Sequence, residues 1–245
     1  MEKPVFLIND NSSNRFFGYD VEEFLQMDST VDFKEVDTFI SKNKGKHIFT
    51  FLSYDIKNSI EKLFSDNTNF VPNPALLLWC PSVLIQESEE GLNLLKGDLT
   101  DEIKAIYDRL LQEKSTSEQK FDFRALTSTD EYLLNVIKLK DHIQKGDIYE
   151  INYCQSYIAE SNKPIDPQEI YQVVNSITKA PFSAFVKWND FALACGSPER
   201  YIEKKRQQII SQPIKGTAKR GETNEEDKLI IEALANDPKE RAENV

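Results

Sequence analysis

The sequence predicts an α+β chain, in which hairpin-like pairs of strands and capped amphipathic helices occur along one globular polypeptide. Of its 245 residues, 40% are apolar and 11% are aromatic, which suffices for a packed core and argues against disorder. Two runs with strand character, Phe182–Trp188 and Phe191–Cys195, flank the tight-turn pair Asn189-Asp190. The length corresponds to one large domain or to a domain and a half.

The charge and cysteine content argue against several classes of partner. The formal net charge is −11, and the basic residues are scattered, which argues against nucleic acid or an anionic membrane surface as partner. No apolar run approaches the roughly 20 residues of a spanning helix, and the start of the chain lacks a signal-peptide pattern. Three well-separated cysteines and two histidines form no metal-type pair, so we expect reduced thiols and a cytoplasmic location.

The first third of the chain is predicted to be mainly strands. Pro4–Ile8 has the character of a first strand, and His47–Tyr54 that of another, followed by a helix at Asp55–Leu63. The aromatic residues of Arg15–Phe24 are interpreted as packing under a loop. Ala75–Ile85 is predicted to be a buried strand that breaks or bends at its internal proline.

Two helices and a connector follow. Thr100–Glu113 has an apolar stripe and acidic residues at its N-terminal end. The polar stretch Lys114–Phe121 is interpreted as a connector between an N-terminal sub-domain, residues 1–115, and a second part, residues 122–245. Ser128–Lys145 is predicted to be a helix, because it opens with a capping box and a glycine follows it.

The next predicted strand, Ile148–Ile158, contains an amide of interest. Alternation places Gln155 on the same face as four large side chains, Tyr149, Ile151, Tyr153 and Tyr157. Two interpretations are open. Gln155 is either an amide at the edge of the core that backbone groups satisfy, or a residue that faces a substrate.

Three more helices are predicted in the last third. Asp166 caps the first, whose apolar stripe consists of Ile170, Val173, Val174 and Ile177. Thr223 caps the second, which runs to Asn236, and Asp237 starts the third.

Two ionisable residues of opposite type, Glu199 and Lys215, lie at the ends of a predicted hairpin made of Arg200–Glu203 and Gln207–Ser211. Because a hairpin brings its ends together, both side chains can face one cavity. A carboxylic acid that donates a proton and an amine that attacks carbon are the parts of acid-assisted covalent substitution. Each residue also has a simpler interpretation, Lys215 as a surface lysine in a turn and Glu199 as an ion-pair partner of Arg200 or of a neighbouring lysine.

Three motifs in order carry a family resemblance. They are Ser197-Pro-Glu-Arg, then Pro213-Ile-Lys-Gly-Thr with Arg220-Gly221, then Lys239-Glu-Arg-Ala-Glu-Asn. Together they resemble the chorismate-utilising enzymes, and among these most closely the large subunit of the aminodeoxychorismate synthases. The resemblance implies an α+β chorismate-binding fold, as in anthranilate synthase component I, with packed β-sheets and outer helices. Residues 122–245 would be the first part of its catalytic domain, with the remainder missing.

The resemblance also implies roles for individual residues. Lys215 would attack C2 of the chorismate ring while Glu199 protonates the departing C4 hydroxyl, and ammonia would then enter at C4 and expel the lysine. Gly216 and Thr217 would offer backbone N–H groups and a hydroxyl to a substrate carboxylate. Gln155 stands where isochorismate and salicylate synthases have a lysine that activates water. Since glutamine cannot take a proton, it points away from water chemistry.

Cofactor and partners follow from the same resemblance. Glu243 matches a glutamate that binds Mg²⁺, and the second carboxylate for this metal would lie beyond Val245, so the 245-residue chain alone is expected to be inactive. A glutamine amidotransferase subunit would supply ammonia, and the product would serve folate biosynthesis through para-aminobenzoate. Two alternatives stay open: anthranilate synthase component I, which typically has alanine where Lys215 stands, and a non-catalytic chorismate-binding or partner-docking fragment.

Overall fold

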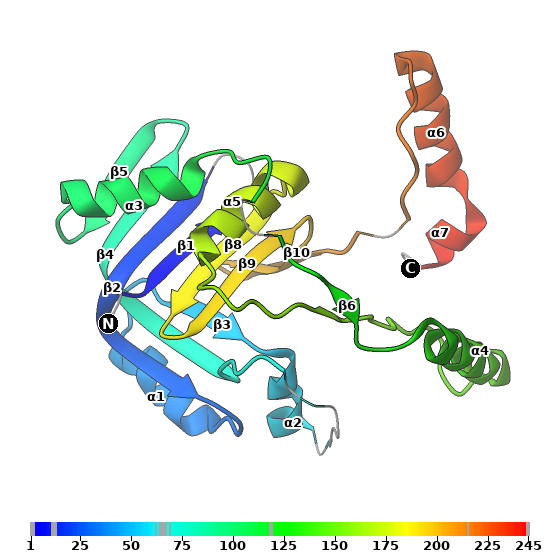
Figure 1. The fold of residues 1–245 in the computed structure, drawn as a ribbon, viewed down its shortest axis with the longest axis horizontal. Helices are drawn as coiled ribbons and strands as arrows, with labels where there is room; N and C mark the ends of the chain where they lie inside the picture. The colour runs from blue at the N-terminus through cyan, green and yellow to red at the C-terminus, as the bar shows by residue number, and fades with distance from the viewer. Residues whose placement is uncertain are drawn as a thin grey trace.

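The computed structural model describes residues 3–10, 14–61, 63, 68, 70–117, 120–214 and 216–243. Its centre is an antiparallel seven-stranded sheet with the order β3-β4-β2-β1-β8-β9, in which β5 also pairs with β4 (Figure 1). The strands are β1 (Val5–Asn9), β2 (Arg15–Met27), β3 (Phe49–Leu52), β4 (Leu76–Ser88), β5 (Gly91–Lys96), β8 (Phe182–Trp188) and β9 (Phe191–Ser197). Strands from both sides of the predicted connector therefore share one sheet, and the division into 1–115 and 122–245 stays a prediction.

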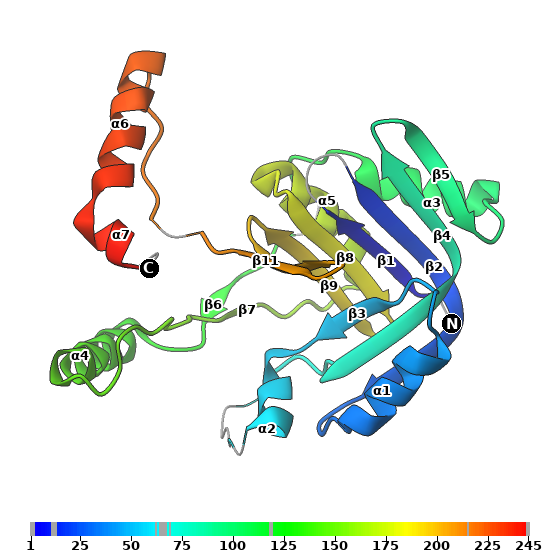
Figure 2. The ribbon, with the colours of Figure 1, turned by 180° about the vertical axis from the view of Figure 1, so that it is seen from behind.

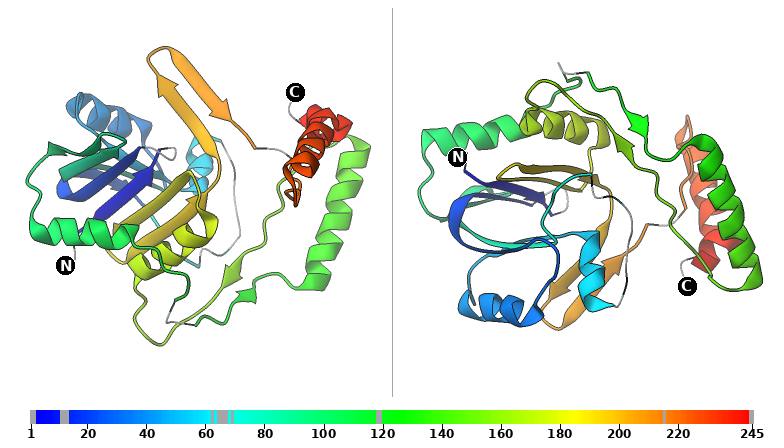
Figure 3. Two further views of the ribbon diagram at one scale, coloured as in Figure 1. Left: turned by 90° about the horizontal axis from the view of Figure 1, so that it is seen from above. Right: turned by 60° about the horizontal axis from the view of Figure 1, so that its bottom comes forward.

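Two helices, α3 (Asp101–Leu111) and α5 (Pro167–Thr178), cover one face of this sheet (Figure 3). They bury Tyr107 and Tyr171 against strand residues that include Phe17 and Phe185. Both helices were predicted, and α5 begins at its predicted cap, Asp166. The apolar stripe predicted for α5 is partly wrong, because the helix turns Tyr171 towards the sheet and leaves Ile177 70% exposed.

Aromatic residues fill the other face. Phe6, Phe49, Trp79 and Trp188 form a buried cluster, and the Trp79 indole N–H donates to the carbonyl of Asp20 at 2.9 Å. Beside it, α1 (Phe33–Lys42), which was not predicted, packs on a third cluster of buried residues. Near the end of β3 lie the short helices η1 (Tyr54–Ile56) and α2 (Lys57–Ile60). The predicted helix at Asp55–Leu63 is therefore found only as far as Ile60. Residues 61 and 63 are not helical, and residue 62 lies outside the described residues.

One sequence prediction about this sheet is wrong, and a second, the buried strand at Ala75–Ile85, is confirmed as β4 without the predicted break. The stretch Arg15–Phe24 does not pack under a loop, because it lies within the 13-residue strand β2, whose aromatic side chains alternate between the two faces. Nor does Pro81 break β4. It pairs with Val21, and the irregularity falls on β2, where the register shifts between Val21 and Glu23. Since proline cannot donate a ladder hydrogen bond, the neighbouring strand accommodates it with a bulge.

The remaining described residues form two arms that leave the sheet on the same side (Figure 2). The first arm, residues 121–162, carries β6 (Arg124–Ala125), α4 (Thr129–Lys145) and β7 (Tyr157–Ile158). The second arm, residues 198–243, carries β10 (Arg200–Lys205), β11 (Gln208–Gln212), α6 (Asn224–Asn236) and α7 (Pro238–Glu243). Neither α4 nor α6 has a buried residue.

The strand predicted at Ile148–Ile158 is also wrong, since only Tyr157 and Ile158 pair, and their partners are Arg124 and Ala125. The rest of that stretch has no neighbouring strand among the described residues. No helix in the described part of the chain is long and apolar enough to cross a membrane.

Candidate functional site

Of the six predicted site residues, the five that the structure describes lie on the two arms and none of these on the sheet. Gln155 belongs to the first arm. Glu199, Gly216, Thr217 and Glu243 belong to the second. Lys215 and the side chain of Glu243 lie outside the described residues. The arms therefore position the candidate site, and the sheet supports them.

The predicted hairpin is confirmed as β10 and β11. Pairing of Arg200 with Gln212 brings the two ends of the hairpin together, and Arg206 makes the turn in the left-handed region at φ +56°. Glu199, just before the first strand, has an exposed side chain. Its approach to Lys215 across the hairpin stays a prediction.

Arg200 fixes the base of this hairpin to the sheet. Its guanidinium donates to Asp10 at 3.0 Å and pairs with Glu203, and it lies 5.0 Å from the centre of the Phe182 ring. Its carboxylate partners are therefore Asp10 and Glu203. No ion pair of Glu199 is found among the described residues, which leaves its carboxyl group available for another role.

Gly216 brings the second and third motifs against each other. Its φ of +49° is one that glycine adopts readily, and a Cβ at this position would lie 1.9 Å from Oε2 of Glu240. A side chain here would push the Glu240 carboxylate away from this position. Glu240 lies in the first turn of α7, which Asp237 caps by accepting from the N–H groups of Lys239 and Glu240. The glycine thus allows a carboxylate of the third motif to sit on the backbone of the second, while Thr217 beside it is exposed.

The Arg220-Gly221 part of the second motif is tied to α6. The Arg220 Nε donates to both carboxylate oxygens of Asp227, at 2.7 and 2.8 Å, and the Gly221 N–H donates to the same group at 2.9 Å. These hydrogen bonds, with that of Arg220 first, lower the pKa of Asp227. The carboxylate of Asp227 therefore offsets most of the positive charge of Arg220.

The amide of Gln155 is half satisfied. Its Nε2 donates to the carbonyl of Thr127 at 2.9 Å, as the interpretation of a core-edge amide requires. Its Oε1 is buried and has no hydrogen-bond partner among the described residues. An acceptor of this kind is ready for a donor group on a ligand or on a further segment of protein.

For the chorismate turnover that the resemblance implies, we expect Gln155→Ala in the complete protein to raise the KM roughly 5- to 150-fold, because a buried polar group left without its hydrogen-bond partner costs about 1–3 kcal/mol. Steady-state kinetics and thermal unfolding of the same preparations check this. Gln168→Ala is the matched control, since its Oε1 is likewise buried and unpaired but lies on α5. A large fall in melting temperature with unchanged kinetics would favour the core-edge interpretation.

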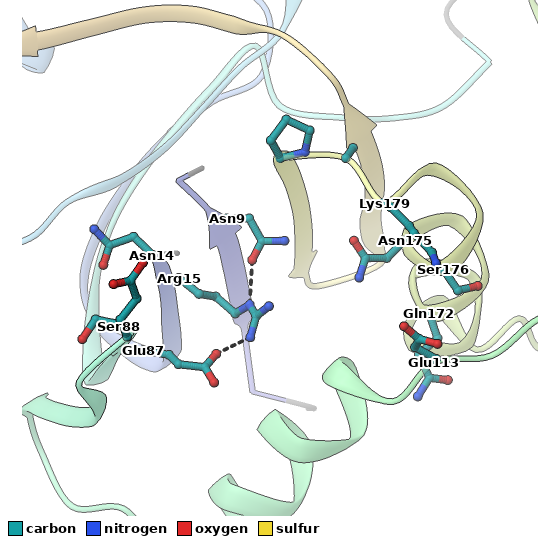
Figure 4. A pocket seen from close by; sticks show the side chains of 13 residues that line it. Asn9, Asn14, Arg15, Glu87, Ser88, Glu113, Gln172, Asn175, Ser176 and Lys179 are labelled. Carbon is teal, nitrogen blue, oxygen red and sulfur yellow. Dashed lines mark hydrogen bonds and ion pairs between the residues drawn. The ribbon is translucent and has the colours of Figure 1, made fainter. Parts of the chain in front are cut away.

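A cavity of about 400 Å³ opens on the sheet, between its β1, β2 and β4 strands and α5 (Figure 4). At its wall the Arg15 Nε donates to Asn9 at 2.6 Å, and the guanidinium also pairs with Glu87, which accepts from the Tyr107 hydroxyl at 2.7 Å. Burial raises the pKa of Tyr107, so it stays a donor at neutral pH. None of the predicted site residues lines this cavity. The sequence interpretation missed it because Arg15–Phe24 was not recognised as a strand.

Acidic residues do not gather into a metal site in the described part of the chain. No group of three or more histidine, cysteine, aspartate or glutamate side chains is placed to hold an ion there. Hard cations such as Mg²⁺ take about six oxygen ligands, several of them from water. The described residues therefore do not by themselves make up the magnesium site that the resemblance implies.

Comparison with known proteins gives consistent results. The family described as chorismate binding enzyme matches residues 3–245. Aminodeoxychorismate synthase component 1 of Bacillus subtilis (strain 168) is 30% identical over 211 residues, which cover 80% of this chain and 44% of the relative. The chain therefore spans less than half the length of this relative.

Two solved structures share the fold. Anthranilate synthase component I from Streptococcus pneumoniae TIGR4 superposes with a TM-score of 0.74 at 15% identity, covering 95% of this chain and 59% of that one. A putative 2,3-dihydroxybenzoate-specific isochorismate synthase from Bacillus anthracis superposes with a TM-score of 0.61 at 18% identity, covering 99% and 57%. With the family match over nearly every residue, these results show that the chain belongs to the chorismate-binding enzymes and has their α+β fold.

Proposed function

We propose that the complete protein is the large component of an aminodeoxychorismate synthase, which converts chorismate and ammonia to 4-amino-4-deoxychorismate. The observation that carries this proposal is Lys215 between Ile214 and Gly216, within a chain whose curated relative in Bacillus subtilis bears that name. The activity is proposed for the complete protein, because this chain spans 44% of that relative.

In the proposed reaction the Lys215 amine forms a bond to C2 of the ring, both ring double bonds shift (C1=C2 to C1=C6 and C5=C6 to C4=C5), and the C4–O bond breaks. Glu199 supplies the proton with which the hydroxyl leaves as water. Ammonia then forms the C4–N bond and the C2–N bond to lysine breaks, which restores the enzyme. The exposed position of Glu199 and its freedom from Arg200 support this role.

The lysine has to be neutral to attack. With an ordinary pKa of about 10.4, deprotonation at pH 7 costs about 4.6 kcal/mol unless the site lowers the pKa. We expect burial in the complete protein to do most of this, with Lys219 as the neighbouring charge. Arg220 contributes little, because Asp227 offsets its charge.

Two further components belong to the proposal. Glu243 would be one ligand of a Mg²⁺ ion, which when bound supplies positive charge to a carboxylate of the substrate. A glutamine amidotransferase subunit would release the ammonia. The name of the Bacillus subtilis relative, a component 1, favours such a partner for the complete protein.

Anthranilate synthesis is the second candidate, because anthranilate synthase component I superposes with a TM-score of 0.74. The test is to incubate the complete protein with chorismate, ammonium and Mg²⁺ and to separate the products by liquid chromatography and mass spectrometry. We expect 4-amino-4-deoxychorismate, and no turnover by the 245-residue chain under the same conditions. Anthranilate with pyruvate, or isochorismate, would contradict the proposed reaction.

A further inference from the structure

We propose that Arg200 and Asp10 are positioning residues for Glu199, and that the ion pair between them holds the backbone of this acid in one place relative to the sheet. Neither residue is assigned a contact with the substrate. The inference rests on the amination proposed above, in which Glu199 donates a proton.

The backbone of Glu199 is held on its N-terminal side by Ser197, the last residue of β9. The Ser197 hydroxyl donates to the Glu199 carbonyl at 3.0 Å and accepts from the Glu199 N–H at 3.3 Å. On the C-terminal side Arg200 opens β10, while the side chain of Glu199 itself is exposed. The acid therefore lies between two points that are tied to the sheet.

Arg200 is buried where the β10–β11 hairpin projects from the sheet (Figure 3). Its side chain is only 12% exposed, it donates to Asp10 at 3.0 Å, and it also pairs with Glu203. Its guanidinium lies 5.0 Å from the centre of the ring of Phe182, which opens β8 and is the ladder partner of Ser197. One side chain thus contacts the end of β1, the start of β8 and the hairpin.

The partner on the sheet is fixed as well. Asp10 directly follows β1, and its N–H donates to the carbonyl of Asn14 at 2.8 Å. The residue before it, Asn9, pairs with Arg15 in the ladder between β1 and β2. The Asp10 carboxylate therefore starts from a backbone that the sheet holds, and a shift of β10 would pull the ion pair apart.

The charge of Arg200 provides direction as well as contact. Burying an ion pair costs desolvation, so an apolar side chain could attach the hairpin to the sheet as firmly. A guanidinium, in contrast, donates hydrogen bonds in fixed, planar directions. The two carboxylates and the ring face around it restrict Arg200 to one orientation, and Glu199 is the residue bonded to it in the chain.

Arg200 also fixes the other end of the hairpin. Its backbone pairs with Gln212, which immediately precedes the motif at residues 213–217. The register shifts between Arg200 and Glu203, and a bulge of this kind bends a strand locally. The anchor therefore sets the starting points of both segments, the one with the proposed acid and the one with the proposed nucleophile.

A double-mutant cycle on the complete protein tests the positioning role. We expect Arg200→Gln to lower kcat roughly 10- to 100-fold with little change in KM, because a small misplacement of a catalytic group costs up to about 100-fold. In the Glu199→Gln background the same change should cost less than about threefold, because no acid is left to position. Asp10→Asn should act in the same direction as Arg200→Gln. Arg200→Lys, which keeps the charge opposite Asp10, should recover part of the loss.

A control and a second measurement complete the test. Lys204→Gln, at an exposed lysine of the same hairpin, should leave kcat unchanged. Hydrogen–deuterium exchange of the 245-residue chain, followed by mass spectrometry, reports the anchor without any activity. Arg200→Gln and Asp10→Asn should each speed exchange of the β10 and β11 amides by about tenfold or more, with little change in β2 and β4.

Two results would overturn the positioning role while wild-type turnover stays intact. One is unchanged exchange of the hairpin amides in both variants, which would show that the ion pair does not anchor it. The other is an equal loss of kcat with and without Glu199, which would show that Arg200 supports the fold alone. If the wild-type complete protein makes no 4-amino-4-deoxychorismate, the proposed function itself fails, and the exchange data still report the anchor separately.

Discussion

Lys215→Ala in the complete protein is expected to lower turnover of chorismate with ammonia by at least 1,000-fold. In the proposed mechanism Lys215 is the nucleophile of the covalent intermediate, and the methyl group of alanine cannot take that role. Without ammonia the second substitution cannot occur, so the wild-type protein with chorismate and Mg²⁺ should accumulate an adduct. Intact-mass spectrometry should show a gain equal to chorismate less one water, on the peptide that contains Lys215.

Two variants make this test specific. Glu199→Gln should slow formation of the adduct without moving it, because the hydroxyl group would then leave unprotonated. Lys228→Ala, at an exposed lysine of α6 that has no role in the proposed mechanism, should keep the adduct and most of the activity. If no adduct forms and Lys215→Ala retains most of its turnover, ammonia attacks the ring directly and the covalent mechanism is wrong.

Trp79→Ala is expected to lower the free energy of unfolding of the 245-residue chain by about 3–5 kcal/mol. The side chain is fully buried, with Phe6, Phe49 and Trp188 around it at ring-centre separations of 5.4–5.7 Å. Its removal leaves a large cavity and also takes away the donor for the Asp20 carbonyl. Urea unfolding followed by far-ultraviolet circular dichroism measures the change.

The two contributions can be separated. Trp79→Phe keeps most of the packing and loses only the indole N–H, so we expect a smaller cost of about 1–3 kcal/mol. Tyr201→Ala, at a side chain that is 86% exposed, should change the stability by less than about 0.5 kcal/mol. A loss below 1 kcal/mol for Trp79→Ala would show that the aromatic cluster is not the centre of the core.

The elements that sequence reasoning placed well are those with local signals. The caps at Ser128, Asp166 and Thr223 each accept the expected backbone N–H, and the Asn189-Asp190 turn joins β8 to β9. The β10–β11 hairpin was found for the same reason. Short-range hydrogen bonds and turn preferences determine these features, so a single sequence contains the information.

The errors concern contacts between distant parts of the chain. β2 pairs with both β1 and β4, and no local pattern in Arg15–Phe24 shows these partners. The stretch Ile148–Ile158 has the side-chain alternation of a strand, but only two of its residues pair with another strand. For the candidate site, the sequence indicated the residues and their resemblance to a family. The distances between these residues depend on how the two arms are held, and no short motif specifies that arrangement.

The pairing of β1 with β8 has a consequence for biosynthesis. Phe6 lies opposite Val186, about 180 residues later in the chain. At a translation rate of about 5–20 residues per second, β8 is synthesised roughly 9–36 s after β1. During that time one side of β1 is an open edge with apolar side chains on both faces, which is a template for pairing with other chains. Newly made chains are therefore most open to strand pairing with other chains before β8 has left the ribosome.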